Sequence, residues 1–415
     1  MNILILAGAY PYSMRPSSGI FNEKCVKALK DMGHQLVVVA PRPYVPSFLK
    51  KHSRWKMYSC IEKFQMRNGV PVFRPAMLVI PRLGAALWVD SVAYYTLKGM
   101  IRNLHDNKQF DVLLSFDLSE TGGVAWRIGR ELQIPSCGWA FGEDVRFKKT
   151  SGLGKVVSRA LRNLNLIFYQ SRELLEVAAK LLDRSMNLMS KKQHVVLSHG
   201  IPEPPFLDKK KTSSQIRAEL GIEASQIVVT FVGRIVKEKG IFELVKSVSS
   251  AILQNPRLIC LMIGSVPSFD NTKLLEKFVL EQSAIVHDKI KILPACNHHR
   301  VWEILCGTDI FVFPSHREGM PNSLLEAMAL GVPGIAFGIP PVLEIDSGKG
   351  TLLVVPPFDS AALSDAILAL ARSPEKRKAF GAKGMAEVKA RFMVKKNMTE
   401  LIDLIAQMKT NLKFS

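Results

Sequence analysis

The chain has 415 residues, of which 47% are apolar and 22% are charged, and its formal net charge is +20. This length exceeds one ordinary hydrophobic core, so we expect two domains. The six cysteines are scattered without a Cys-x-x-Cys pair, which argues against a disulfide framework or a zinc site and favours reduced thiols in a cytoplasmic protein. The most apolar long stretch, 76–101, is interrupted by Arg82, Asp90 and Lys98, so we do not expect it to cross a membrane.

The positive charge is uneven along the chain. Residues 1–205 hold 29 Lys and Arg against 15 Asp and Glu, whereas the remainder holds 27 against 21. Basic residues with apolar or aromatic neighbours concentrate in 47–58, 146–163 and 183–194. Such a surface would attract an anionic lipid surface or an anionic glycan; an ordinary solvated surface is the alternative. Nucleic acid is disfavoured because no nucleic-acid-binding module is visible.

The first half alternates short apolar runs with helical segments. The opening run, NILILAG, passes directly into a turn without a basic leader, so we interpret it as a first β-strand and not as a signal peptide. Further strands are expected at HQLVVVAP, VPVFRPA, DVLLSFD, IPSCGWAF, LIFYQS and HVVLSHG, with helices at 21–32, 122–131 and 173–182. Segment 201–215 is rich in proline and then in lysine, which predicts a linker.

The second half repeats the alternation. Strands are expected at IVVTFVG, LICLMIG, IKILPAC, DIFVFPS, PGIAFGI and GTLLVVP, with helices at 241–254, 271–281, 299–306, 323–330 and 361–371. Apolar strands that alternate with helices indicate parallel sheets covered on both faces, and thus an α/β fold of doubly wound sheets. The tail 409–415 is expected to be mobile.

The segment HREGMPNSLLEAMALGVPGIA, residues 316–336, carries the most specific signal. It predicts a short helix, with Glu318 just before its start and Glu326 more than one turn inside. The helix start contains Gly319, Met320, Pro321, Asn322 and Ser323. Proline suits a first helical turn, and the free N–H groups beside it favour an anion such as phosphate. Because carboxylates accept hydrogen bonds from hydroxyls, a nucleotide-sugar fits; a purely structural role for both glutamates is the alternative.

A second segment, 228–248, predicts a buried strand, a turn, a basic loop and a helix. Gly233 allows a sharp backbone turn where the strand ends. Arg234 and Lys239 then lie at the carboxyl end of a strand, where open α/β sheets bind ligands. Both side chains are suited to phosphate oxygens.

Together, GRIVKEKG and the later EGMPNSLLEAMALGVP resemble the donor half of GT4-type retaining glycosyltransferases of the GT-B fold, the glycosyltransferase group 1 family. The N-terminal 41 residues, VVLSHGIPEPPF, CGTDIFVFPSHREG and ARFMVKKNMTELIDLI are similar to further parts of that family. The resemblance implies two Rossmann-like domains that face each other across a cleft. Residues 1–203 would bind the acceptor, with a C-terminal helix 394–415 crossing back to them, and residues 204–393 would bind a UDP- or GDP-sugar.

The resemblance also implies roles for single residues. Glu326 would bind the ribose hydroxyls, and Glu318 would contact the donor sugar near the reacting carbon. Arg234 and Lys239 would stabilise the leaving diphosphate, and Gly19 would let the backbone of the first loop approach it. The sugar would be transferred with retention of configuration to a glycan or lipid-linked acceptor.

One departure from the family pattern concerns the acceptor side. A histidine is usual where this chain has Phe141. Asp144 is our first candidate for the missing catalytic group, followed by Glu143 and Glu120, although each could be only a helix cap. Gly264 and Ser265 also stand where a fuller glycine loop is common.

Several rival motifs are absent from the sequence, including GxGxxG, the P-loop, HExxH and Asp-x-Asp. A metal-held diphosphate usually needs paired carboxylates, so we predict no obligatory metal or other cofactor. The neighbours His298 and His299 are interpreted as a surface feature and not as a metal site, and His316 as a loop residue and not as a base.

We therefore predict a cytoplasmic glycosyltransferase of cell-surface polysaccharide or lipid-linked glycan synthesis, with peripheral contact to the inner face of the plasma membrane. A GT-B phosphorylase or sugar-nucleotide epimerase is the alternative among enzymes. A glycosyltransferase-like binding subunit that has lost its chemistry is the alternative outside them, supported by Phe141.

Overall fold

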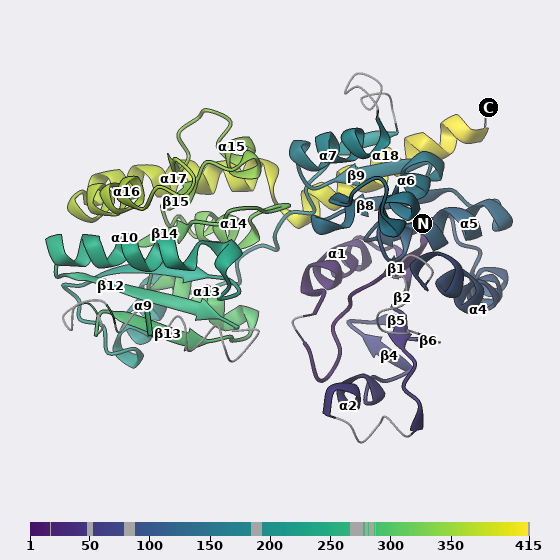
Figure 1. Cartoon of the computed structure of the whole chain (residues 1–415), viewed down its shortest axis with the longest axis horizontal. Helices are drawn as coiled ribbons and strands as arrows, with labels where there is room; N and C mark the ends of the chain where they lie inside the picture. The colour runs from purple at the N-terminus through teal and green to yellow at the C-terminus, as the bar shows by residue number, and fades with distance from the viewer. Residues whose placement is uncertain are drawn as a thin grey trace. The chain divides into compact units, whose positions relative to one another are not determined.

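The computed structural model describes the chain except residues 17, 48–52, 79–87, 184–192, 266–276, 279–280, 282–285, 287 and 414–415. The chain forms two compact units (Figure 1). Unit 1 contains Met1–His199 and Val394–Ser415, and unit 2 contains Gly200–Met393. The first boundary between the units, after His199, thus comes a few residues before the predicted domain boundary after residue 203.

Unit 1 is built on an eight-stranded sheet with the strand order β10-β9-β8-β7-β1-β2-β5-β4. Its strands are β1 Asn2–Ala7, β2 Gln35–Val39, β4 Phe64–Arg67, β5 Val70–Phe73, β7 Val112–Phe116, β8 Ser136–Ala140, β9 Leu166–Tyr169 and β10 His194–Val196. All neighbours pair in parallel except β4 and β5. The antiparallel edge strand β4 was not predicted, because its residues FQMR form no apolar run. A short pair, β3 Arg42–Pro43 and β6 Ala76–Met77, lies outside this sheet.

Helices cover both faces of this sheet. The helices of unit 1 are α1 Ile20–Asp31, α2 Ser53–Ser59, α4 Ala93–Lys108, α5 Gly122–Leu132, α6 Gly152–Asn163, α7 Arg172–Leu182 and α18 Val394–Lys413, with short helices η2 Trp88–Val92 and η3 Glu143–Val145. Successive strand residues point to opposite faces. Leu4 and Leu6 therefore pack with α4 to α7, and Ile3 and Ile5 pack with α1 and α18.

Unit 2 has a six-stranded parallel sheet with the order β13-β12-β11-β14-β15-β16. Its strands are β11 Ile227–Val232, β12 Leu258–Gly264, β13 Ile290–Pro294, β14 Ile310–Phe313, β15 Gly334–Phe337 and β16 Leu353–Val355. Its helices are α9 Lys209–Glu219, η4 Lys237–Lys239, α10 Ile241–Gln254, α13 His298–Cys306, α14 Asn322–Ala329, α15 Pro340–Asp346, α16 Ser360–Arg372 and α17 Pro374–Arg391. Val229 and Phe231 face α10, α14 and α16, whereas Val228 faces α9 and α13.

Two local predictions were wrong. The predicted linker 201–215 contains the start of α9, whose first turn is capped by Asp208 accepting a hydrogen bond from the Lys211 N–H at 3.1 Å. The tail predicted to be mobile is helical through Lys413, and the Lys409 ammonium lies 2.6 Å from Asp111. Most of the helix predicted at 271–281 falls outside the described residues. In the part of the chain that the structure describes, no helix is both long and apolar enough to span a bilayer.

Candidate active site

The predicted donor residues lie where the strand order of unit 2 reverses direction. From β11 the chain proceeds outward through β12 and β13, and it then returns to the other side of β11 as β14. Arg234 follows β11, and Glu318 follows β14. Since open α/β sheets bind ligands at such a switch point, outside the carboxyl ends of the strands, the topology brings both predicted segments to one candidate site.

Two glycines allow the loops of this site to approach closely. Gly240 has a φ of +66°, and a Cβ there would overlap the Pro314 carbonyl oxygen. A Cβ at Gly264 would overlap the Gly233 carbonyl oxygen. The turn after β11 is further held by the Ile235 N–H, which donates to the Ser265 carbonyl at 2.9 Å. Gly264 and Ser265, a departure from the family pattern, thus pack against the Gly-Arg turn.

Lys239 and Glu318 form an ion pair, with side chains only 19% and 12% exposed. The loops that carry them are also tied through the backbone, because the His316 N–H donates to the Glu238 carbonyl at 3.0 Å. The site therefore holds a cation and a carboxylate together at the switch point. Arg234 lies in the same connection between β11 and α10 as Lys239 and is an exposed cation, with no ion pair among the described residues.

His316 lies in the loop after β14, as predicted. Its ring centroid is 4.5 Å from that of Phe358, and its Nε2 is 3.2 Å from a Glu243 carboxylate oxygen. These contacts hold the loop that leads to Glu318.

The start of α14 has no side-chain cap. Among the described residues, the N–H groups of Gly319, Met320 and Ser323 have no hydrogen-bond partner, which leaves them available to an acceptor. The Asn322 N–H was predicted to be free, but it donates to the Met320 carbonyl at 3.0 Å. Within the same part of the chain, Ser315 Oγ and Asn322 Oδ1 are buried without partners. Orphaned polar atoms of this kind call for an explanation, and a bound ligand provides one.

Glu326 is only 4% exposed, so it is not a solvated residue of an amphipathic helix. One of its carboxylate oxygens lies 2.6 Å from His298 Nε2. The Trp302 indole N–H donates to His298 Nδ1 at 3.0 Å. Nδ1 must therefore be an acceptor, which places the proton of the neutral ring on Nε2, facing Glu326.

The interpretation of His298 as a surface feature was therefore wrong. The spacing of His298 and Trp302, one turn apart on a helix, is a signal that could have indicated an interacting pair. Their contact with Glu326 joins segments distant in sequence, so no local pattern could predict it.

In unit 1, Gly19 stands at the start of α1 with a φ of +63°. A Cβ there would overlap the Ala9 carbonyl oxygen, which also accepts from Asn22 Nδ2 at 2.8 Å. Gly19 is thus required by the close folding of the first loop. Its predicted approach to a diphosphate is untested.

Phe141 occupies the position where the family pattern has a histidine, and it belongs to an aromatic group. Its ring centroid is 5.7 Å from that of Trp139, 5.8 Å from Phe116 and 5.6 Å from His199. The aromatic ring therefore serves packing here.

Asp144 is buried, and its carboxylate accepts three backbone hydrogen bonds, from the N–H groups of Gly142 at 2.8 Å, Phe141 at 3.0 Å and Leu118 at 3.1 Å. Burial, and next the charge of Asp117, raise the pKa of Asp144 to about 7. This geometry is that of a carboxylate that anchors the loops after β7 and β8. A catalytic role for Asp144 remains a prediction.

Two further carboxylates lie near Asp144, and sequence reasoning missed one of them, Asp117. Asp117 has a φ of 107° and accepts hydrogen bonds from Ser119 and Glu120. Glu120 is exposed as a residue, but its carboxyl group lies over Gly8, where a Cβ would overlap it. This burial, and next the charges of Asp117 and Asp144, raise the pKa of Glu120 to about 7. The third candidate, Glu143, is 71% exposed and lies 3.9 Å from Arg146.

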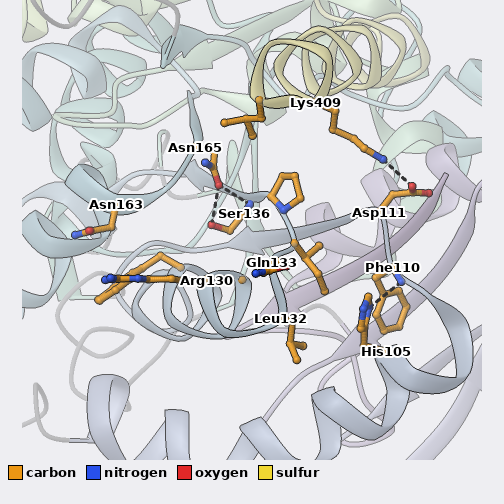
Figure 2. A pocket seen from close by; sticks show the side chains of 15 residues that line it. His105, Phe110, Asp111, Arg130, Leu132, Gln133, Ser136, Asn163, Asn165 and Lys409 are labelled. Atoms are coloured by element: carbon orange, nitrogen blue, oxygen red, sulfur yellow. Dashed lines mark hydrogen bonds and ion pairs between the residues drawn. The ribbon is translucent and has the colours of Figure 1, made fainter. Parts of the chain in front are cut away.

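A cavity of about 670 Å³ lies at the opposite, amino-terminal edge of the unit 1 sheet. Figure 2 shows Asn165 bonded to Ser136, and Lys409 paired with Asp111, in its wall. Asn165 and Asp111 directly precede β9 and β7, Ser136 is the first residue of β8, and Lys409 lies on α18. The cavity is thus separate from the loops that carry Gly19 and Glu120.

Comparisons with known proteins agree with this geometry. The family model described as "Glycosyl transferases group 1" matches residues 212–387. TuaC of Bacillus subtilis strain 168, assigned to teichuronic acid biosynthesis as a glycosyltransferase, is 30% identical over 376 residues, which cover 88% of this chain and 88% of TuaC. The chain belongs to the group 1 glycosyltransferases.

Two further similarities extend this assignment. The capsular polysaccharide biosynthesis glycosyltransferase CapM of Staphylococcus aureus is 30% identical over 199 residues, 47% of this chain and 49% of CapM. Among solved structures, the fold is similar to that of Anabaena HepE in complex with UDP. The superposition covers 98% of this chain and 100% of the HepE chain, with a TM-score of 0.74 and 15% sequence identity. The fold is therefore GT-B, as the resemblance in the sequence implied.

Proposed function

We propose that this glycosyltransferase transfers a sugar, with retention of configuration, from a UDP- or GDP-sugar to an acceptor in cell-surface polysaccharide assembly. The observation that carries the proposal is the Lys239–Glu318 pair beside the uncapped start of α14. A cation and free N–H groups favour a bound diphosphate, and a carboxylate can accept hydrogen bonds from sugar hydroxyls. The names of TuaC and CapM support a polysaccharide product.

In this proposal the bond between the anomeric carbon and the diphosphate oxygen breaks as the acceptor oxygen bonds to the same face of that carbon. Arg234, Lys239 and the start of α14 stabilise the negative charge that builds on the diphosphate, and they do so more strongly in the transition state than before it. Glu318 holds hydroxyls of the donor sugar. Glu326, oriented by His298, accepts from the ribose hydroxyls.

The acceptor hydroxyl loses its proton in this reaction. We propose that the Glu120 carboxylate accepts that proton as the acceptor oxygen bonds to the sugar, because Glu120 is exposed as a residue and its raised pKa suits proton exchange near neutral pH. Asp144, whose oxygens are occupied by backbone N–H groups, positions the neighbouring loops instead.

We also propose that the reaction needs no metal ion. Arg234, Lys239 and the helix start supply the positive potential that a cation would otherwise provide. Full turnover in excess EDTA is the expected result. Loss of turnover in EDTA, with recovery on adding Mg²⁺ or Mn²⁺, would contradict this proposal.

The experiment that tests the function is a panel of nucleotide-sugars screened for thermal stabilisation, because a ligand that binds the folded state raises its stability by mass action. The stabilising donor is then incubated with candidate acceptors, and the anomeric configuration of the product is determined by NMR. An α-linked product from an α-linked donor is expected. An inverted product would contradict retention. Phosphorolysis or epimerisation of the nucleotide-sugar would instead support a phosphorylase or an epimerase, and donor binding with no turnover on any acceptor would support a binding subunit without chemistry.

A further inference from the structure

A second group of cations lies in unit 1, at the carboxyl edge of its sheet. The strands β1, β2 and β5 are adjacent and parallel. Arg15 lies in the loop after β1, Arg42 follows β2, and Arg74 follows β5 directly. Because the carboxyl ends of parallel strands meet at the same edge, the segments that follow these three strands each place one arginine there. All three line one pocket of about 180 Å³.

Arg74 is the central member of this group, and its side chain is only 2% exposed. Its Nη2 donates to the Pro11 carbonyl at 2.7 Å and contacts Gln65 Oε1 at 3.3 Å. Its Nε and Nη1 are buried and have no hydrogen-bond partner among the described residues, and the same holds for Arg42 Nε. Buried charged donors without an acceptor are unfavourable, so these groups indicate an acceptor that arrives from outside the chain.

The described lining of the pocket contains no Asp or Glu. Arg15, Arg42 and Arg74 form no ion pair with any described residue. The nearby Glu23 is already engaged, because it pairs with Arg67 and accepts from Asn68 at 2.9 Å. Glu62 and Glu23 attract the Arg74 charge electrostatically, but among the described residues no carboxylate forms an ion pair with any of the three arginines.

Aromatic side chains complete the lining. Tyr10, Tyr12 and Tyr58 contribute to the pocket wall, and their rings offer flat apolar faces while their hydroxyls can hydrogen-bond. The volume is below the roughly 300 Å³ at which pockets for whole drug-sized ligands begin. The pocket is thus suited to one sugar residue and not to an entire nucleotide-sugar.

We propose that this pocket binds an acidic sugar residue of the acceptor, whose carboxylate or phosphate is held by Arg15, Arg42 and Arg74. The inference rests on the proposed transferase function and names its acceptor class. The charge selects an acidic residue over a neutral one, and the tyrosines contact the ring. A uronic acid and a sugar phosphate share this chemistry, and the test separates them.

The test is a ligand-observed NMR titration of the full chain with D-glucuronate, glucose 1-phosphate, D-glucose and inorganic phosphate. At least one acidic sugar should bind tenfold or more tightly than glucose and inorganic phosphate, and the tighter of the two acidic sugars identifies the anionic group. Arg15→Gln and Arg42→Gln should each weaken that binding about tenfold, since each removes charge-assisted hydrogen bonds. Arg74→Gln should do the same, provided that its circular dichroism spectrum is unchanged.

Arg130→Gln is the matched control, because Arg130 is an exposed arginine of the same unit that lines the cavity in Figure 2 at the opposite sheet edge. It should leave acidic-sugar binding unchanged. Equal binding of glucose and the acidic sugars, equal binding of inorganic phosphate, or unchanged binding in both Arg15→Gln and Arg42→Gln would overturn the inference. Donor binding, measured on the same samples, separates the two proposals: its absence with acidic-sugar binding intact would refute only the transferase function.

Discussion

At the scale of single residues, the site depends on charges that the protein keeps close together and partly out of water. Lys239 and Glu318 neutralise each other until a ligand arrives. A diphosphate would compete for the lysine, and a sugar hydroxyl would compete for the glutamate. Under the proposed function, the pair would hold both side chains near the conformation that binding requires, which would lower the entropic cost of binding.

We expect Lys239→Ala and Arg234→Ala each to lower kcat/KM by about ten- to a hundredfold, because a hydrogen bond to a charged group contributes roughly 1.5–3 kcal/mol. Initial rates with the best donor, together with circular dichroism spectra, check this. Lys237→Ala is the matched control, since Lys237 is an exposed lysine of the same short helix. Normal turnover of both variants at saturating donor would remove the diphosphate-binding assignment.

The buried carboxylates of unit 1 predict a pH dependence of stability. Burial raises the pKa values of Asp117, Glu120 and Asp144, the last two to about 7. At these groups the folded state then binds more protons than the unfolded state between about pH 4 and 7, so their contribution to stability is greatest below this window and is lost as the pH rises through it. The slope can reach about 1.4 kcal/mol per pH unit for each such group.

The variant Asp117→Asn should flatten that decline. It removes the charge that, after burial, contributes most to the raised pKa values of its neighbours, while an asparagine tolerates a positive φ and keeps an acceptor oxygen. The free energy of unfolding by urea, measured at pH 5, 6, 7 and 8, provides the comparison. A parent protein whose stability rises over this range would show that these carboxylates are ionised throughout.

At the scale of helices and strands, the sequence predicted the elements that have a strong local signal. Most strands of the two sheets are apolar runs because they are buried on both faces, and α10 lies at its predicted bounds. Helix α17 was not predicted, because its segment carries two glycines and many charges. It is stabilised by tertiary packing of Gly381 and Gly384 against Gly331 and Met328, close to α14.

The candidate site likewise contains residues that the sequence could locate and contacts that it could not. Residues in a contiguous pattern, such as Arg234 and Glu318, could be located from the sequence. The Lys239–Glu318 pair, the contact of His298 with Glu326, and the arginine pocket join loops that only the strand order brings together. Such contacts leave no periodic pattern in the sequence, so they could not be predicted from it.

The packing of η4 and α10 against β14 predicts an effect of Gly240→Ala. The variant adds strain at a positive φ, about 1–2 kcal/mol, and it also forces a Cβ against the Pro314 carbonyl. We expect a larger loss of stability than strain alone gives, together with weaker donor binding. Gly348→Ala is the matched control, because Gly348 has a φ of +71° and no atom within 4 Å of the added Cβ. Equal unfolding midpoints of the two variants would show that the backbone near Pro314 accommodates the added Cβ, which would contradict the prediction.

At the scale of the whole molecule, the excess positive charge remains to be explained. The predicted basic surface was partly wrong in its composition: Phe147 packs on the core, and Arg146 lies 3.0 Å from Glu173. Residues 48–52 of the stretch 47–58 lie outside the described part, as does most of 183–194. We propose that 47–58 carries any attachment to an anionic membrane.

Changing Lys50, Lys51, Arg54 and Lys56 together to Glu should abolish flotation with anionic vesicles and leave donor binding intact, since each basic residue near such a surface contributes roughly 1 kcal/mol. Flotation of the parent should weaken as salt shortens the Debye length from about 10 Å at 0.1 M to about 3 Å at 1 M. The control reverses four exposed lysines of α17, Lys376, Lys378, Lys383 and Lys389. Equal flotation of both variants would leave 47–58 as an ordinary solvated surface.

The two-segment composition of unit 1 has a consequence for how the chain is made. Met398, Leu401 and Ile405 of α18 are fully buried against the same sheet face as Ile3 and Ile5. The ribosome therefore synthesises all of unit 2 before the residues that complete that core exist. Until then, the nascent unit 1 exposes an apolar face to which chaperones and other nascent chains can bind. Unit 2, being continuous, is free to fold first, so the donor half can form while the acceptor half is still waiting for its last helix.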